Sequence, residues 1–318
     1  MTDATGEPVR VALASWLPAD LPLDARIQTL MEGAVVEALS PLLTARGQSG
    51  HPPPRLRVVI AISDDRPGLP PRWGQVMADG LQQALAGRFP GAKVELRSSG
   101  HAAGATALQR GCQLVLNDEV ELCLVGGADS HLGPENLLQL EAQRQLHGAD
   151  DNSWGFIPGE ASGFCLLATH ATARHYGLAS LLELVSVAVA RERHTFRSGQ
   201  VCTGTGLSQA VAQVLAAGRA AQVDVVVTDQ NGEPQRADEF GFTLARHAER
   251  FRAPPNFQVP ATSWGDVGAA SAPLFASLII ASGQRGYAAG EHALLLTSSE
   301  TEERGALLVR LDSLPQPH

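Results

Sequence analysis

The residues best placed to do chemistry lie in a short turn, Ser98-Ser99-Gly100-His101, which precedes a run of small residues. Residues 102–116 predict a helix whose first half is almost entirely alanine and glycine, so other backbones can approach it closely at the centre of the protein. The first N–H groups of such a helix are unpaired and give its N-terminus partial positive charge. Enzymes place activated nucleophiles on turns of this kind, and this turn offers hydroxyl and imidazole groups rather than a thiol.

The elements that would position this turn alternate between strand and helix along the whole chain. Apolar runs predict strands at residues 10–14, 57–62, 92–97, 121–125, 163–168, 181–189, 223–228, 257–262, 292–297 and 306–311. Helical patterns between them cover residues 23–43, 71–89, 102–116, 134–146, 206–217, 237–251 and 269–282. The order reads βαβαβαββ twice, apart from the additional helix at residues 134–146, and the third helix of each repeat is the one made of small residues.

This repetition predicts two related halves, residues 1–170 and 171–318. Strands that are apolar throughout indicate parallel sheets covered by helices on both faces. With one thin central helix from each half, the expected fold is α/β in five layers, α/β/α/β/α. The strand at residues 92–97 differs from the others, because its charged and apolar side chains alternate as they do in an edge strand.

Composition narrows the possible function classes. The chain has 318 residues and a formal net charge of −9, with no basic cluster that would suit a nucleic acid. No apolar run is long enough for a membrane span and the N-terminus lacks a signal pattern, so we expect a cytoplasmic protein. Cys112, Cys123 and Cys165 lie in apolar segments and are expected to be buried. The histidines and cysteines show no ligand spacing, so the sequence predicts neither a metal nor a cofactor.

Four phrases in this order resemble the β-ketoacyl synthases, a family of the thiolase fold. They are GGADS at residues 126–130, GFIPGEASGFCLL at 155–167, VDVVVTD at 223–229 and SWGDVGAAS at 263–271. The resemblance extends over residues 11–311 and implies a duplicated thiolase-like fold. It also implies a homodimer, or a heterodimer with a related synthase-like chain, formed through the strand at residues 92–97. A carrier or adaptor protein is the other partner that it implies.

Every catalytic position that the resemblance assigns is changed in this chain. His101 occupies the position of the acyl-carrying cysteine, and Gln230 and Asp266 occupy those of the two histidines. Thr262 stands where the family has a lysine, and TSSETEERG at residues 297–305 replaces a glycine-rich loop. An imidazole forms no durable thioester, an amide relays no proton, and an aspartate repels a developing oxyanion. The resemblance therefore implies a non-catalytic relative that serves as a scaffold, adaptor or heterodimer partner.

Two alternatives remain open at this stage. His101 and Asp266 could form a pair that activates Ser99, with Asp229 in the same polar cluster, which would make the chain an acyl-thioester hydrolase or acyltransferase. The old acyl cleft could instead bind a small molecule without chemistry, which requires an open apolar pocket.

Overall fold

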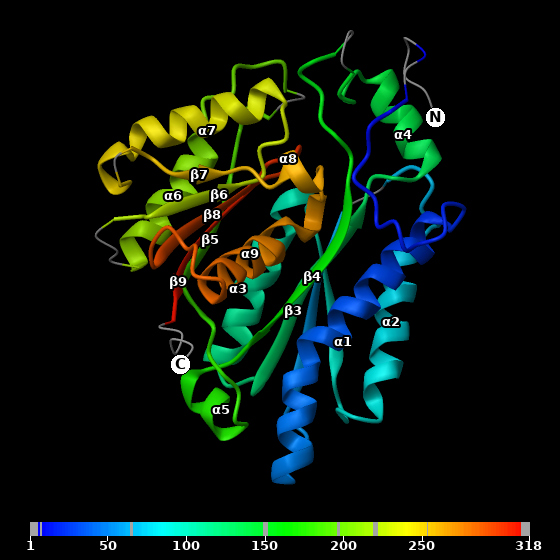
Figure 1. Ribbon diagram of the computed structural model, residues 1–318, viewed down its shortest axis with the longest axis vertical. Helices are drawn as coiled ribbons and strands as arrows, with labels where there is room; N and C mark the ends of the chain where they lie inside the picture. Colours follow the sequence, from blue (N-terminus) through cyan, green and yellow to red (C-terminus); the bar gives the residue numbers. More distant parts are fainter. Residues whose placement is uncertain are drawn as a thin grey trace.

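The computed structural model describes residue 6 and residues 8–63, 66–148, 152–195, 198–218, 222–252 and 254–312. Two β-sheets form its framework, with helices between them and on their outer sides (Figure 1). The candidate site residues lie where the carboxyl ends of parallel strands meet the N-terminal ends of the central helices.

The first sheet has the strand order β2-β1-β3-β4. Its strands are β1 (Leu56–Ile62), β2 (Lys93–Ser98), β3 (Leu122–Ser130) and β4 (Glu160–Leu167). β1 pairs in parallel with β2 and β3, whereas β4 pairs antiparallel with β3. Every residue of β3 is buried, so the GGADS sequence at its end brings polar side chains into the interior.

The second sheet has the order β5-β9-β8-β6-β7. Its strands are β5 (Leu182–Arg191), β6 (Val225–Thr228), β7 (Phe257–Gln258), β8 (His292–Ser298) and β9 (Glu303–Leu311). β6 is parallel to β7 and β8, while β9 is antiparallel to both β8 and β5. The prediction of wholly parallel sheets is therefore wrong. The turn between β8 and β9 is too short for the crossover that a parallel pair needs.

The two small-residue helices, α3 (Ala103–Leu116) and α9 (Ser271–Gln284), lie between the sheets (Figure 1). α1 (Leu23–Ser49) and α2 (Trp73–Ala86) cover the outer side of the first sheet. α6 (Thr205–Gly218), with α7 (Pro234–Arg246) packed beside it, covers the second sheet. The central helices approach closely because they lack bulk: a Cβ on Gly104 would lie 2.9 Å from Pro273 Cδ.

Three further α-helices are short: α4 (Pro134–Ala142), α5 (His170–His175) and α8 (Ala261–Trp264). The described residues also form the 3₁₀ turns η1 (Gly100–Ala102), η3 (Ala248–Arg250) and η4 (Gly268–Ala270). Several predicted elements differ from the structure: the helix predicted at residues 23–43 continues to Ser49, for example, and the strand predicted at residues 121–125 continues to Ser130. Residues 10–14 form no strand, and Ala12 makes only an isolated bridge to Gly159. The strand predicted at residues 257–262 stops after Gln258, because Pro260 cannot donate to a ladder. The helix predicted at residues 237–251 begins earlier, at a proline whose fixed φ suits a first turn, and ends at Arg246.

Within the described residues, no helix is both long and apolar enough to cross a membrane. Of the cysteines expected in the core, Cys123 is buried, but Cys112 and Cys165 are only half-buried, which corrects the prediction for those two. Burial nevertheless raises the pKa of Cys112 and Cys165 to about 11 and that of Cys123 to about 12. All three thiols are therefore protonated at neutral pH.

Candidate functional site

His101 lies at the junction of β2 and α3, where the strand leads into the turn η1. Gly100 begins this turn with a φ of +60°, a conformation that glycine adopts without strain. The hydroxyl of Ser299, in the loop after β8, accepts a hydrogen bond from Ala102 N at 2.9 Å and donates one to the carbonyl of Ser99. This clamp holds the N-terminal end of α3, and the His101 side chain is buried beside it.

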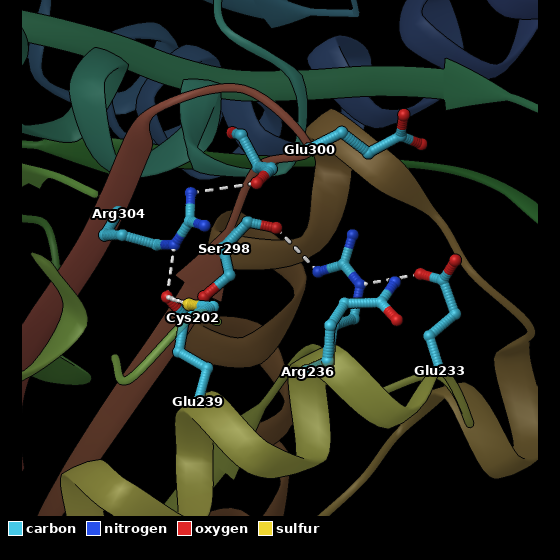
Figure 2. A pocket seen from close by; sticks show the side chains of 9 residues that line it. Cys202, Glu233, Arg236, Glu239, Ser298, Glu300 and Arg304 are labelled. Atoms are coloured by element: carbon cyan, nitrogen blue, oxygen red, sulfur yellow. Dashed lines mark hydrogen bonds and ion pairs between the residues drawn. The ribbon is translucent and has the colours of Figure 1, made fainter. Parts of the chain in front are cut away.

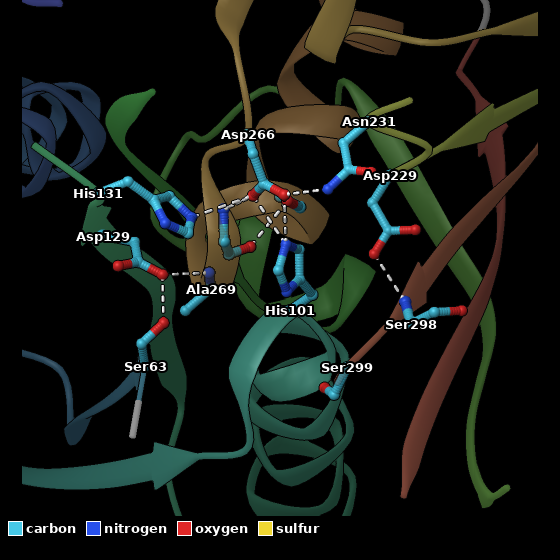
Figure 3. A network of polar contacts seen from close by, with 12 residues as sticks. Ser63, His101, Asp129, His131, Asp229, Asn231, Asp266, Ala269, Ser298 and Ser299 are labelled. Carbon is cyan, nitrogen blue, oxygen red and sulfur yellow. Dashed lines mark hydrogen bonds and ion pairs between the residues drawn. The ribbon is translucent and has the colours of Figure 1, made fainter. Parts of the chain in front are cut away.

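Asp266 comes from the other half of the chain and meets His101 above the N-terminal end of α3 (Figure 3). Its two carboxylate oxygens lie 2.7 Å and 2.9 Å from His101 Nε2. The same carboxylate accepts hydrogen bonds from Asn231 Nδ2 at 2.7 Å and from the backbone N–H of Gly268 at 2.9 Å. Asp266 is therefore a buried acceptor with several donors, held by segments that are far apart in the sequence.

Arg236, on the first turn of α7, places a buried guanidinium beside His101. Figure 2 shows this guanidinium with its partners Glu233 and Ser298. It donates from Nη1 to Asp229 Oδ2 at 3.1 Å and from Nε to Glu233 Oε2 at 3.1 Å. Its Nη2 lies 3.3 Å from His101 Nε2 and 3.4 Å from Nδ1. Both ring nitrogens of His101 are thus within hydrogen-bonding distance of Asp266 or Arg236.

A second buried group extends these contacts toward the first sheet. His131 follows the end of β3, and its Nε2 lies 3.3 Å from an oxygen of Asp266. Arg66 Nη1 lies 2.9 Å from His131 Nδ1, and Arg66 makes two hydrogen bonds of 2.8 Å to the Asp129 carboxylate. Asp129 also accepts the backbone N–H of Ala269 at 2.8 Å, at the start of the second central helix (Figure 3). We call the connected residues the buried ion network: His101, Asp266, Asn231, Arg236, Asp229, Glu233, His131, Arg66 and Asp129.

The charges in the buried ion network follow from burial and from neighbouring groups. Burial disfavours the His101 cation, but the adjacent Asp266 carboxylate outweighs it, and the pKa of His101 is raised. Burial lowers the pKa of His131, and the Arg66 charge lowers it further. Burial opposes the Asp266 anion, yet His101 and the hydrogen bonds hold the pKa of Asp266 well below its usual range. The shifts in pKa favour the charged form of His101, paired with the Asp266 carboxylate, and the neutral form of His131.

We expect the contribution of His101 to stability to disappear as the pH rises through its raised pKa. A histidine of this kind stabilises the fold fully below its unfolded-state pKa of about 6.5 and no longer does so above its folded-state pKa. The contribution of His131 depends on pH in the opposite direction, because a group with a lowered pKa stabilises the fold at high pH and loses this contribution as the pH falls. Urea unfolding of the wild type and of His101→Gln, from about pH 6 to about pH 9, measures the effect. The difference between them should shrink toward high pH, and a constant difference would contradict the assignment.

The other predicted site residues do not all join the network. Asp229 does, through its ion pair with Arg236. Ser99 Oγ is buried and has no hydrogen-bond partner among the described residues. Gln230 is half-buried and makes no hydrogen bond within the described part of the chain, and Thr262 is exposed on α8, where its hydroxyl donates to a nearby backbone carbonyl. The structure thus brings together three of the predicted residues, His101, Asp229 and Asp266, through Arg236 and direct contact. Ser99, Gln230 and Thr262 do not take part in these contacts.

Little open space lies beside the network. A hollow of about 20 Å³ next to Arg236 is lined by Glu233, Glu239 and Arg304 among other residues (Figure 2). That volume holds about one water molecule, whereas ligand pockets typically measure about 300–1,000 Å³. A larger hollow of about 310 Å³ lies on the side of β2 and β5, with Ser99 in its wall. His101 itself is buried, and the larger open space lies beside β2 and β5.

One group in the network has the donor types of a metal site. Ligand atoms of His101, His131 and Asp266 lie within 4.8 Å of one another. However, the guanidinium groups of Arg236 and Arg66 lie 3.3 Å and 2.9 Å from ring nitrogens of the two histidines. Two buried cations at such distances repel a divalent ion. The donor set fits an ion network better than a metal centre.

Comparison with known proteins relates part of this chain to a family. Residues 90–173 match the β-ketoacyl synthase N-terminal domain. The ketosynthase from module 6 of the bacillaene synthase of Bacillus subtilis 168 superposes with a TM-score of 0.73 at 11% identity, over 93% of this chain and 61% of that one. The chain is ketosynthase-like and has a thiolase-like fold. It spans about three fifths of the length of that Bacillus chain.

Two further structures resemble this ketosynthase-like chain over most of their length. One is a chain of the AntDE:AntF complex, a type II PKS acyl-carrier protein with its ketosynthase bound to the hexaketide. It matches with a TM-score of 0.69 and 14% identity, over 88% of this chain and 86% of that one. The ishigamide ketosynthase/chain length factor matches with a TM-score of 0.70 and 14% identity, over 92% and 84%. Identities this low show the fold alone. No curated protein matches the sequence.

Proposed function

We propose that this chain is a non-catalytic ketosynthase-like protein that acts as a cytoplasmic scaffold, adaptor or heterodimer partner. We further propose that it is a five-layered thiolase-type protein of two related halves, residues 1–170 and 171–318. The observation that supports this most strongly is the buried ion network at the N-terminal end of α3. By the family resemblance, His101 stands at the position of the acyl-carrying cysteine, and it is engaged by Asp266 and Arg236.

The network lacks the groups that condensation requires. The acyl carrier must be a thiolate that attacks a thioester and later leaves, whereas His101 is an imidazole paired with a carboxylate. A developing oxyanion must meet hydrogen-bond donors, and Asp266 presents an anion there instead. The hollow beside Arg236, of about 20 Å³, holds about one water molecule rather than an acyl chain. These features support a retained fold without the condensation chemistry.

The hydrolase or acyltransferase alternative is favoured by one observation, the hydrogen-bonded pair of His101 and Asp266. A serine hydrolase also needs the second imidazole nitrogen to take the proton of the serine. In this chain Arg236 lies 3.4 Å from that nitrogen, and Ser99 Oγ has no hydrogen-bond partner among the described residues. The pair therefore lacks a nucleophile in the right place, and we retain this activity as the second candidate.

Pairing with a second chain is the part of the proposal for which similar structures offer a precedent. One of them is a ketosynthase/chain length factor, and another contains a ketosynthase with its acyl-carrier protein. We propose a homodimer or heterodimer through the outer edge of β2. Glu95 on this strand forms ion pairs with Arg97 at 3.0 Å and Arg110 at 3.1 Å, so the edge is charged and can be matched by a complementary one. A carrier or adaptor protein is the other proposed partner.

The proposal predicts that the pure protein performs no acyl transfer. It is incubated with acyl and malonyl thioesters, free and on a carrier protein, and its intact mass and the ketoacyl product are measured. We expect an unchanged mass and no product, whereas an active ketosynthase in parallel gives both an adduct and a product. A covalent acyl adduct on Ser99 or His101 with steady turnover would reject the non-catalytic function and support the hydrolase or acyltransferase.

A further inference from the structure

The outer edges of the two sheets are protected to different degrees. An unpaired strand edge invites pairing with other chains, and proteins protect such edges with charged side chains, bulges or very short strands. β2 carries the charges of Lys93, Glu95 and Arg97, and β7 has only two residues. β5 has an irregularity in its pairing between Leu184 and Ser186.

β4 has none of these protections. It runs for eight residues, EASGFCLL, and pairs with β3 in unbroken register. Its only charged residue, Glu160, is buried and forms an ion pair with Arg26 at 2.6 Å. Among the described strands none pairs with the other edge of β4, and Ala161, Ser162 and Leu166 remain partly exposed. In Figure 1, β4 lies at the front of the molecule between α9 and α1.

The second sheet has an additional strand at the position that corresponds to the open edge of β4. β1, β3 and β4 pair in the same directions as β6, β8 and β9. Beyond β9, the second sheet continues with β5, which pairs antiparallel along residues 303–311. The first sheet ends at β4. The position beyond β4 therefore corresponds to one that holds a single antiparallel strand.

The segment that precedes α1 does not fill this position. Its place in the chain corresponds to that of β5, which precedes α6. Ala12 N donates to Pro158 O at 2.9 Å and Ala14 N to Glu160 Oε1 at 2.8 Å, so the segment is held at the beginning of β4. Val9 packs against a separate apolar cluster that includes Phe156. Along its remaining length, the edge of β4 has no neighbouring strand among the described residues.

The side chains beside this edge indicate the chemistry of its occupant. Leu274 and Leu278 of α9 are partly exposed, and a Cβ on Gly163 of β4 would lie 2.8 Å from Leu274 Cδ2. In the second sheet, β5 packs leucine and valine side chains against the central core: Leu182, Leu184, Val187 and Val189. A strand of similar composition would cover the partly exposed leucines of α9.

We propose that the outer edge of β4 accepts one extended strand, antiparallel to β4 and rich in leucine and β-branched residues, donated by a partner protein. The backbone groups of β4 bind the strand, and the leucines of α9 select its side chains. The proposal rests on the sheet topology and does not depend on whether the chain is catalytic. It also differs from pairing through β2, which lies at the opposite edge of the same sheet.

Hydrogen exchange in the presence of synthetic peptides tests this proposal. One peptide has the sequence of residues 182–191, and a second has that of residues 8–15. At saturation, at least one of them should slow the exchange of amides in residues 161–167 about tenfold or more, with no change in β2. If neither peptide slows exchange in β4, the proposal is overturned.

N-methylated peptides separate backbone pairing from simple apolar contact. A strand uses only one of its edges to pair, so methylating alternate nitrogens of one parity should abolish the effect, and methylating the other parity should preserve it. If both methylated peptides act equally, strand pairing is rejected.

Two variants complete the experiment. Ala161→Lys places a charge on the open edge and should abolish the peptide effect. Val76→Lys adds the same charge to an exposed position on α2 and should leave it unchanged. Light scattering tests whether a second copy of this chain occupies the edge instead. Self-association of the wild type that Ala161→Lys removes would assign the edge to a second copy and contradict the donated strand.

Discussion

Replacing Asp266 with alanine is expected to lower the free energy of unfolding by about 3–5 kcal/mol, the usual cost of removing one partner of a buried ion pair. The carboxylate is only 3% exposed and lies 2.7 Å from His101 Nε2, so the variant leaves a buried cation without its counter-charge. It also leaves the Asn231 amide and the Gly268 N–H without the acceptor that they have at 2.7 Å and 2.9 Å. Urea unfolding at neutral pH measures the loss.

An exposed ion pair provides the control for this experiment. Glu302 lies 3.7 Å from Arg191 at the surface, and Glu302→Ala should cost no more than about 1 kcal/mol. Asp266→Asn removes the charge with little change in volume and should also be destabilising. A double-mutant cycle with His101→Gln should give a coupling energy above about 1 kcal/mol. If Asp266→Ala is as stable as Glu302→Ala, the network does not stabilise the fold.

Much of the fold can be predicted from the sequence because burial on both faces selects continuous apolar runs. The run at residues 57–62 falls within β1, the run at residues 121–125 overlaps the first part of β3, and the small-residue runs coincide closely with α3 and α9. The same pattern does not reveal strand direction, which is why β4 and β9 were expected to be parallel. Nor does it reveal which tertiary partner a segment prefers, and residues 10–14 lie beside the beginning of β4 rather than in a sheet.

The site is less predictable than the fold. His101 and Asp266 are 165 positions apart, and only the family resemblance suggested that they meet. Arg236, Asn231 and His131 were not predicted, because polar residues after strands and in first helical turns are usually exposed. Two signals were nevertheless present: His131 directly follows GGADS, and Asn231 adjoins the predicted position Gln230. Their burial depends on neighbours that are distant in sequence, which no local pattern records.

A cysteine at position 101 is expected not to restore condensation. His101→Cys should react at least about 10⁴-fold more slowly than an active ketosynthase, because Gln230 and Asp266 replace two proton-handling groups that each typically contribute about 10²-fold or more. The Asp266 anion would also raise the pKa of a neighbouring thiol and reduce its thiolate fraction, although Arg236 acts in the opposite direction. Intact mass after exposure to acyl thioesters and quantification of the ketoacyl product measure the two steps separately.

Asp266 keeps its contacts with His131, Asn231 and the Gly268 N–H in this variant, so His101→Cys is expected to fold. Circular dichroism and urea unfolding verify this before the assay. Ser99→Cys is the matched control, because it places a thiol near the same helix end without removing a member of the buried ion network. Turnover by His101→Cys within about 10²-fold of the active enzyme would mean that the chain lacks only its thiol. Inactivity of both folded variants would instead locate the defect in the charges around position 101, because a thiol alone cannot compensate for an anion where the oxyanion must form.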